Sequence, residues 1–156
     1  GCDCMQKSVV VDGSEVSLYL YDTAGQERFA DMAANYYRSG DVCLLCFDVS
    51  SAAGFDQARW WRQRVAEHND RCSFIMVATK EDLIEANGID VSHIREFASK
   101  EGMPLFLTSA LTGGDNIDIL FRFVAEKCKS SYLQRQLDGS RSQSVKLAPA
   151  SALGRP

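Results

Sequence analysis

The chain of 156 residues lacks an apolar run long enough to cross a bilayer, and it opens without the pattern of a secretory signal. Its longest apolar runs, Val42–Phe47 and Phe74–Ala78, fall far short of the roughly twenty residues that a membrane helix needs. It also lacks an excess of basic residues, since 17 Lys and Arg stand against 21 Asp and Glu. We therefore expect one cytoplasmic domain that binds no nucleic acid.

Residues that commonly form metal clusters are also scarce or badly spaced. The two histidines, His68 and His93, lie far apart and have no third ligand at a suitable spacing. Three of the six cysteines, Cys43, Cys46 and Cys72, lie in or beside apolar strand-like runs, where a thiol behaves as a small apolar side chain. We expect free thiols; a metal or redox role for Cys43-x-x-Cys46 is the alternative that a buried strand disfavours.

The order of apolar patterns predicts an α/β domain. Met5–Val11 and Val16–Tyr21 are β-rich runs around the turn-forming residues 12–14, which predicts an antiparallel hairpin. Buried strands and amphipathic helices then alternate along the chain. The predicted strands are Val42–Val49, Phe74–Thr79 and Pro104–Thr108, and the predicted helices are Ala52–His68, Val91–Lys100 and Asn116–Ser130. This order is typical of a mostly parallel sheet with helices on both faces and the hairpin at one edge.

The ends of the elements and of the domain also have sequence signals. Asp90 is the predicted N-cap of the helix over residues 91–100, and Gly102 lies just past its end. After residue 131 the chain becomes rich in Gly, Ser, Pro and Arg and shows no apolar period. We therefore expect a domain over residues 1–131 and a flexible tail over residues 132–156.

Polar residues follow several predicted strands, at the sheet edge where ligands bind in open parallel sheets. Asp22 ends the second strand, and "DTAG" supplies a carboxylate that could hold Mg²⁺ directly or through a water. Gly25 could bring its N–H close to a phosphate oxygen, and the amide of Gln26 could orient an attacking water. The structural alternative is a strand-end Asp that caps a turn, with glycine present for its backbone freedom.

The run "ATKEDL" places a second carboxylate after the predicted strand Phe74–Thr79. The two oxygens of Asp82 could accept parallel N–H bonds from a guanine edge, which adenine lacks, and the stem of Lys80 could cover the base plane. Read alone, Lys-x-Asp is more often a solvated loop. Ser109 and Ala110 follow the last strand, where a backbone N–H can reach a base carbonyl, although "TSAL" by itself says little.

Together these runs resemble the Rab branch of the Ras-superfamily small GTPases. The resemblance rests on "DTAGQERF", on "NYYRSGD" at residues 35–41 and on "LLCFDVSS" at residues 44–51, and it covers about residues 1–130. It implies a P-loop NTPase-like three-layer sandwich that binds GTP or GDP with Mg²⁺ and hydrolyses GTP. It also implies a switch in vesicle trafficking, peripheral at endomembranes.

The resemblance assigns roles residue by residue. Asp22 is the aspartate linked to Mg²⁺, Gly25 senses the γ-phosphate and Gln26 orients the hydrolytic water. The guanine-specificity motif and the last base-contacting loop are Thr79, Lys80, Asp82, Ser109 and Ala110. Tyr21 and Tyr36 match aromatic positions that show the nucleotide state to effectors, exchange factors and GTPase-activating proteins.

Three positions depart from the pattern of the family. Thr79 replaces the usual Asn, whose amide bridges the base and the phosphate loop, and Leu111 replaces a Lys whose stem packs on the base. Both changes predict a lower nucleotide affinity. Cys4 replaces the usual Phe of the effector surface, so the choice of effector is open.

Larger parts of the pattern do not occur among these residues. No G-x-x-x-x-G-K-[ST] run is present, and the family's first strand, P-loop and first helix have no counterpart. The chain begins with Gly1, and we expect the natural protein to be longer and this chain alone to be inactive. The alternative is a Rab-like binding module without turnover; Asp82 disfavours an adenine-nucleotide enzyme. The last cysteine is Cys128, so we expect membrane attachment to be indirect or through a lipid anchor outside these residues.

Overall fold

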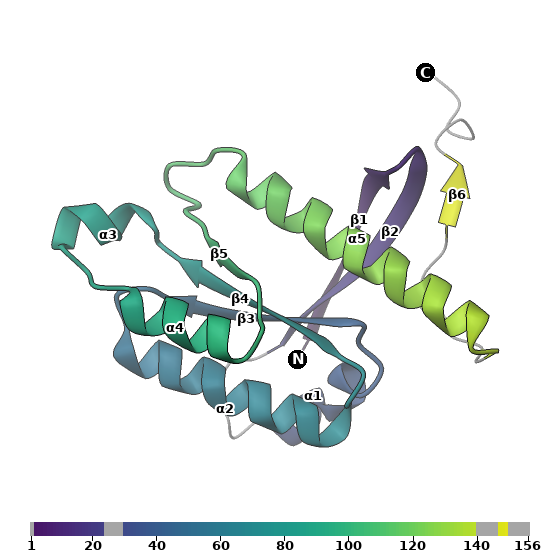
Figure 1. The fold of residues 1–156 in the computed structure, drawn as a ribbon, viewed down its shortest axis with the longest axis horizontal. Coiled ribbons are helices and arrows are strands. Elements are labelled where there is room, and N and C mark those ends of the chain that lie inside the picture. The colour runs from purple at the N-terminus through teal and green to yellow at the C-terminus, as the bar shows by residue number, and fades with distance from the viewer. Residues whose placement is uncertain (1, 24–29, 140–146, 150–156) are drawn as a thin grey trace. The chain divides into compact units, whose positions relative to one another are not determined.

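The computed structural model describes residues 2–23, 30–139 and 147–149. They fall into two compact units, one formed by residues 1–33 with 120–156 and the other by residues 34–119. The first contains β1 (Cys2–Val11), β2 (Ser14–Thr23) and β6 (Leu147–Pro149). The second contains the second half of α1 (Ala30–Tyr37), then β3 (Val42–Asp48), α2 (Ala52–His68), β4 (Ser73–Thr79), α3 (Asp82–Asn87), α4 (Ser92–Lys100) and β5 (Leu105–Leu107). Helix α5 (Asn116–Leu137) begins in the second unit and continues in the first (Figure 1).

The predicted hairpin is confirmed in the first unit. Strands β1 and β2 pair antiparallel from Cys2 opposite Thr23 to Val11 opposite Ser14. The turn residues Asp12 and Gly13 both have positive φ, at 49° and 72°, as a two-residue turn between twisted strands requires. Strand β6 pairs antiparallel with residues 14–16 of β2.

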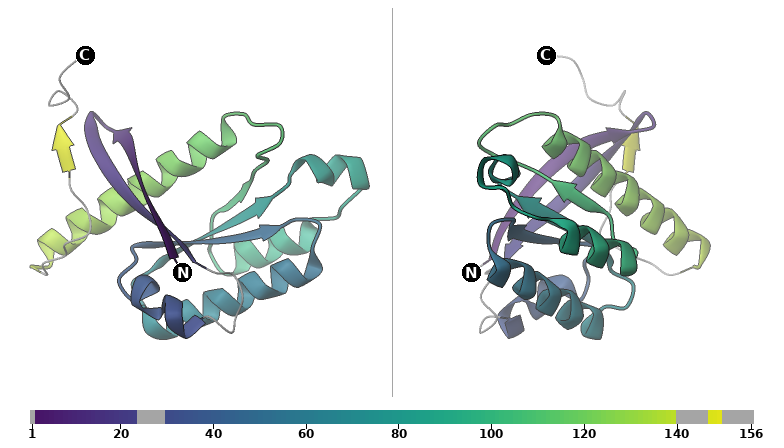
Figure 2. Two further views of the ribbon diagram at one scale, coloured as in Figure 1. Left: turned by 180° about the vertical axis from the view of Figure 1, so that it is seen from behind. Right: turned by 60° about the vertical axis from the view of Figure 1, so that its left-hand side comes forward.

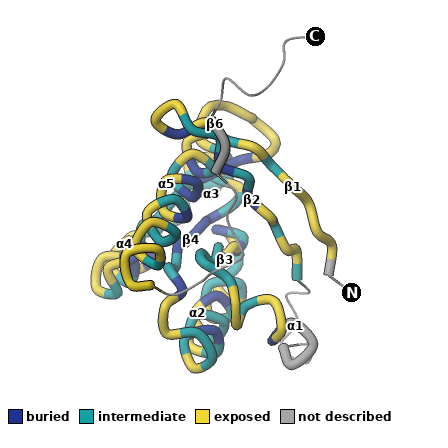
Figure 3. The backbone as a smooth tube through the Cα atoms, turned by 90° about the vertical axis from the view of Figure 1, so that its right-hand side faces the viewer, coloured by how far each residue is buried: buried dark blue, intermediate teal, exposed yellow. Residues whose placement is uncertain are grey.

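Helix α5 fastens the hairpin within this unit. The ammonium of Lys129 donates to the Val11 carbonyl over 3.1 Å and lies 3.4 Å from a carboxylate oxygen of Asp12. The ammonium of Lys7 lies 5.2 Å from the centre of the Phe121 ring. By contrast, residues 3–6 of β1 are exposed (Figure 3).

The second unit contains a parallel sheet in the order β3-β4-β5. Val42 lies opposite Ser73 and Asp48 opposite Thr79, so β3 and β4 end side by side. Helices α2 and α4 cover one face of this sheet and touch each other, with the Phe55 and Phe97 ring centres 5.5 Å apart (Figure 2). Together with the antiparallel hairpin and the helices, this sheet confirms the predicted α/β class.

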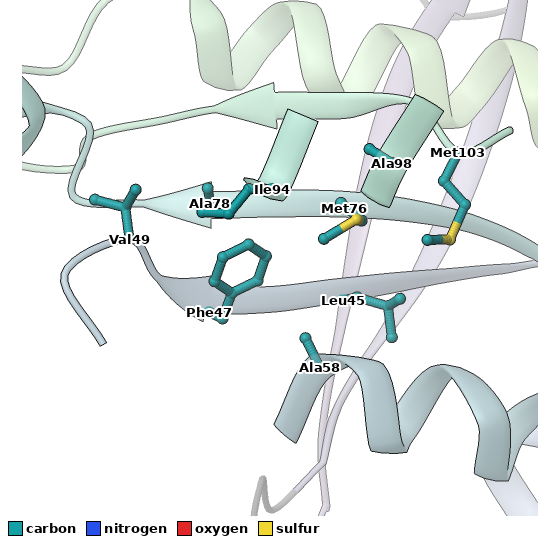
Figure 4. Close-up of a cluster of buried hydrophobic side chains, with 9 residues drawn as sticks. All are labelled: Leu45, Phe47, Val49, Ala58, Met76, Ala78, Ile94, Ala98 and Met103. Atoms are coloured by element: carbon teal, nitrogen blue, oxygen red, sulfur yellow. The ribbon is translucent and has the colours of Figure 1, made fainter. Parts of the chain in front are cut away.

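Alternating apolar residues build the core beneath that face. Figure 4 shows the cluster, whose members are Leu45, Phe47, Val49, Ala58, Met76, Ala78, Ile94, Ala98 and Met103. Burial of a Val, Leu, Ile, Phe or Met side chain contributes about 1.5–3 kcal/mol. The core therefore fixes the ends of β3 and β4 rigidly, and the candidate site follows directly after these ends.

Helix α5 ends later than predicted. It continues past Ser130 to Leu137, so residues 132–137, which composition assigned to the tail, are helical. Leu, Gln and Arg in this stretch are good helix formers, and the Gln134 amide bonds to Asp138 over 3.1 Å. The Gly and Ser content rises only from Gly139, whose φ is 70°. Of the remaining predicted tail, residues 140–146 and 150–156 lie outside the described residues.

Smaller differences concern α4, β5 and two short helices. Helix α4 begins at Ser92 with Val91 as N-cap, and Asp90, the predicted cap, instead accepts the Ser92 N–H over 2.8 Å. The last strand spans only residues 105–107 of the predicted 104–108. Helices α1 and α3 were not predicted, because eight and six residues are too few for a clear apolar period. Over the described ranges, no helix combines the length and apolarity of a membrane span.

Candidate functional site

The candidate site of the second unit lies where β3, β4 and β5 end, at the same edge of the parallel sheet (Figure 1). Two loop segments lie at this edge: residues 79–82, which run from the last residue of β4 to the first of α3, and residues 108–112, which follow β5. The Thr108 N–H donates to the Ala78 carbonyl over 2.9 Å, and the Glu81 N–H donates to the Thr108 carbonyl over 3.0 Å. Backbone bonds therefore hold the two loops side by side.

Asp82 and Ser109, predicted from separate motifs, are in direct contact. The Ser109 hydroxyl donates to Oδ1 of Asp82, and its oxygen accepts the Leu111 and Thr112 N–H groups, each over 3.2 Å. Ser109 is buried, with 3% of its surface exposed, whereas Asp82 opens α3 and is half-buried. The serine thus fixes one carboxylate oxygen, and the carboxylate keeps further acceptor sites for N–H donors of a ligand.

Thr79 is tied to the neighbouring strand through its side chain and its backbone. Its hydroxyl donates to the Phe47 carbonyl over 3.0 Å, and its own carbonyl accepts the Val49 N–H over 3.1 Å. The first residue of the loop is therefore anchored to β3.

Lys80 pairs with Asp48, which ends β3. The ammonium lies 2.6 Å from Oδ2 of Asp48, and Oδ1 accepts the Ser50 N–H over 2.8 Å and the Ser50 hydroxyl over 2.6 Å. These bonds, the one from Lys80 first, lower the pKa of Asp48 to about 2. The same pair raises the pKa of Lys80. Lys80 has φ at 61°, an uncommon conformation for a residue with a side chain, and this ion pair helps to hold it there.

Sequence reasoning missed Asp48 and Asn116 as parts of this site. The Asn116 amide donates to a carboxylate oxygen of Glu81 over 3.2 Å and to the Leu107 carbonyl over 3.3 Å, so it braces both loops. A signal for Asp48 was available: an acid that ends one parallel strand lies at the same edge as the residues that end the next. Asn116, at the start of a long helix, carried no such signal.

Of the other predicted site residues, Ala110 and Asp22 are exposed. Ala110 is exposed beside Ser109, and Leu111 is 84% exposed. Asp22 is an exposed residue of β2 in the first unit and pairs across the hairpin with Asp3. Gly25 and Gln26 lie outside the described residues.

The two tyrosines predicted to face effectors are both exposed. Tyr21 on β2 is 50% exposed and Tyr36 on α1 is 38% exposed. The structure places Cys4, Cys43, Cys46, Cys72 and Cys128 outside any disulfide. Within the described ranges, His, Cys, Asp and Glu form no group of three or more that could hold a metal ion.

Comparison with known proteins gives matches over most of the chain. Residues 1–130 match the model of the Ras family. The chain is 35% identical over 133 residues to Ras-related protein Rab-26 of Bos taurus, which covers 85% of this chain and 52% of that protein. It is 36% identical over 146 residues to Ypt/Rab-type GTPase YPT7 of Saccharomyces cerevisiae, which covers 88% of this chain and 68% of that protein. The chain therefore spans about half the length of Rab-26 and about two thirds of YPT7.

Proposed function

Since the chain belongs to the Ras family and is of the Rab type, we propose that it forms part of a switch that binds GTP or GDP with Mg²⁺ and hydrolyses GTP. The contact between Asp82 and Ser109 is the observation that carries the proposal. It holds a carboxylate at the edge of the parallel sheet, where nucleotides bind in open α/β folds. A guanine edge offers this carboxylate an N1–H and an amino group, whereas adenine would leave it desolvated and unpaired.

The residues of the described site fit a guanine base. Asp82 would accept the two N–H groups, the Ala110 N–H would donate to the base carbonyl and the stem of Lys80 would cover the base plane. Asp48 and Asn116 hold the two loops in place through Lys80 and Glu81.

Asp22, Gly25 and Gln26 are the residues that would act on the phosphates of the nucleotide. Asp22 would hold Mg²⁺ through a water, Gly25 would sense the γ-phosphate and Gln26 would orient the attacking water. Mg²⁺ would supply charge compensation for the phosphates. The exposed Tyr21 and Tyr36 would present the nucleotide state to effectors and regulators in vesicle trafficking. Membrane contact would be indirect or through a lipid anchor.

A second candidate is a Rab-like binding module without turnover. It is favoured by the absence of a G-x-x-x-x-G-K-[ST] run among these 156 residues, because the backbone amides and lysine of that loop hold the phosphates. Both candidates would select guanine, and only the switch would hydrolyse GTP.

The first prediction tests base recognition. The 156-residue chain is titrated with a fluorescent guanine nucleotide and Mg²⁺, and ADP and GDP compete. We expect GDP to compete and ADP to fail, and we expect Asp82→Asn to weaken guanine binding about tenfold or more, since it removes charge-assisted acceptors. Asp56→Asn, a change at an exposed acid of α2, is the matched control and should bind normally.

The outcomes separate the candidates. Equal competition by ADP and GDP, or no effect of Asp82→Asn, would contradict guanine recognition. Measured on the full-length protein, guanine binding together with GTP turnover that Gln26→Leu abolishes supports the switch, whereas binding without turnover supports the module. Gln63→Leu, on the outer surface of α2, is the control for the turnover assay.

A further inference from the structure

Resting on the proposed function, we infer that this site recognises guanine by its N1–H and amino edge and makes no hydrogen bond to the N7 atom of the base. The reason lies in Thr79, the first residue of the loop that carries Asp82. Its single hydroxyl donor is already used within the sheet.

A contact to the N7 atom of guanine requires a hydrogen-bond donor on the protein. Guanine presents N7 and O6 as acceptors, so a protein can read N7 only with a hydrogen-bond donor. An Asn at the first position of this motif has two amide donors, and Thr has one hydroxyl donor. Whether Thr79 can read N7 therefore depends on where that one hydrogen points.

The structure gives this hydrogen a partner in β3. The Thr79 hydroxyl lies 3.0 Å from the carbonyl oxygen of Phe47. Because a carbonyl oxygen can only accept, the hydroxyl donates its hydrogen to it. Phe47 is 5% exposed and belongs to the core cluster, so its carbonyl is on a rigid strand (Figure 4). The bond from the Val49 N–H to the Thr79 carbonyl fixes the backbone of Thr79 beside the same strand. The hydroxyl would have to leave this position in order to donate to a base.

Neighbouring donors are also engaged inside the protein. The Glu81 N–H bonds to Thr108, and the Leu111 and Thr112 N–H groups bond to the Ser109 hydroxyl. The ammonium of Lys80 is held beside the end of β3 by Asp48 at 2.6 Å, a contact that uses one of its three N–H donors. Leu111 has no side-chain donor. The Asp82 carboxylate, which accepts the N1–H and the amino group of guanine, does not depend on these donors. The preference for guanine therefore remains.

The second prediction compares three competitors on the full 156-residue chain with Mg²⁺. 7-deaza-GDP replaces N7 by C–H, and IDP lacks the amino group. We expect 7-deaza-GDP to bind within about twofold of GDP and IDP to bind about tenfold more weakly, because IDP leaves an acceptor of Asp82 without a donor. Thr79→Asn should introduce sensitivity to N7, with 7-deaza-GDP about fivefold or more weaker than GDP.

Thr79→Val is the matched control, since it keeps the shape of the side chain and removes the donor. Its ratio of GDP to 7-deaza-GDP affinity should equal that of the wild type, whatever its absolute affinity. A wild-type chain that binds 7-deaza-GDP fivefold or more weakly than GDP would overturn this inference and leave guanine recognition intact. The same holds if Thr79→Val weakens GDP more than 7-deaza-GDP. If no guanine nucleotide binds to the folded chain, the proposed function itself fails, and this inference with it.

Discussion

At the scale of single residues, one carboxylate joins the ends of two neighbouring strands. Asp48 ends β3 and holds the ammonium of Lys80, which follows β4, while its other oxygen accepts two bonds from Ser50. Lys80 adopts φ at 61°, and Asp48 is the partner that compensates for this conformation. Asp48 is therefore a positioning residue for the segment 79–82 that follows it across the sheet edge.

The third prediction concerns the titration of Asp48. Its pKa of about 2 lies below the ordinary 3.8, so its contribution to stability is present above about pH 3.8 and is lost as the pH falls through about 2. Carboxyl-carbon NMR should show a midpoint near 2. Lys80→Met should raise this midpoint part of the way to 3.8, because the Lys80 bond is the largest cause and the Ser50 bonds remain. Lys100→Met on the outside of α4 should not change it. A midpoint that stays near 2 in Lys80→Met would show that the ion pair does not form in solution.

At the scale of elements, Asn69 connects the end of α2 to the segment after α1. Its amide donates to the carbonyls of Tyr37 and Gly40, each over 2.9 Å. Its backbone N–H closes the last turn of α2 on Val65, over 2.8 Å. The Tyr37 ring also packs edge-on against Trp61, with ring centres 6.4 Å apart. One side chain thus fixes where α1 ends and β3 begins.

The fourth prediction follows from those two bonds. Asn69→Ala leaves the carbonyls of Tyr37 and Gly40 without this donor in a partly buried place, so it should lower the free energy of unfolding by about 2 kcal/mol. Asn35→Ala, at an exposed position of α1, should change it by less than about 0.5 kcal/mol. Urea unfolding followed by circular dichroism measures both, and equal effects of the two changes would contradict the proposed role of Asn69.

At the scale of the whole molecule, the thiols of the half-buried Cys43 and the buried Cys72 limit stability at alkaline pH. Burial raises the pKa of Cys43 and of Cys72 from 9.0 to about 12, and neighbouring negative groups add to this. Because the folded-state pKa lies above the unfolded one, the stabilisation is complete below about pH 9 and is lost as the pH rises through about 12. The exposed Cys4 is not subject to this burial.

The fifth prediction is a decrease in stability above pH 9. At pH 10.5 each thiol should lower the free energy of unfolding by up to about 2 kcal/mol relative to pH 7. Urea unfolding of the wild type and of a Cys43→Ala, Cys72→Ala double variant at both pH values measures this. The double variant should lose less stability between the two, and Cys4→Ala should behave as the wild type does. The same loss in all three proteins would exclude these thiols as the cause.

Much of the fold could be predicted because the signals are local. The hairpin follows from two β-rich runs around Asp12 and Gly13, and β3, α2 and β4 follow from apolar periods that the structure reproduces within a residue. The predicted end of α5 was wrong because the composition was averaged over the whole predicted tail, and the first residues of that tail are good helix formers. Helix α3 was missed because its six residues begin inside the motif itself.

The sequence by itself determined which chemical groups are present and which elements carry them. It placed Asp82 and Ser109 after strands of one parallel sheet, and the similarity to Rab proteins identified the family. Only the tertiary structure decided which group bonds to which: Thr79 to Phe47, Lys80 to Asp48, and Asn116 to Glu81. These partners lie 32 to 35 positions apart in the chain; the first two pairs meet when the parallel strands β3 and β4 align in register, and the third when α5 begins beside the end of β4. The physical reason is that hydrogen bonds depend on distances of about 3 Å, which no local sequence pattern encodes.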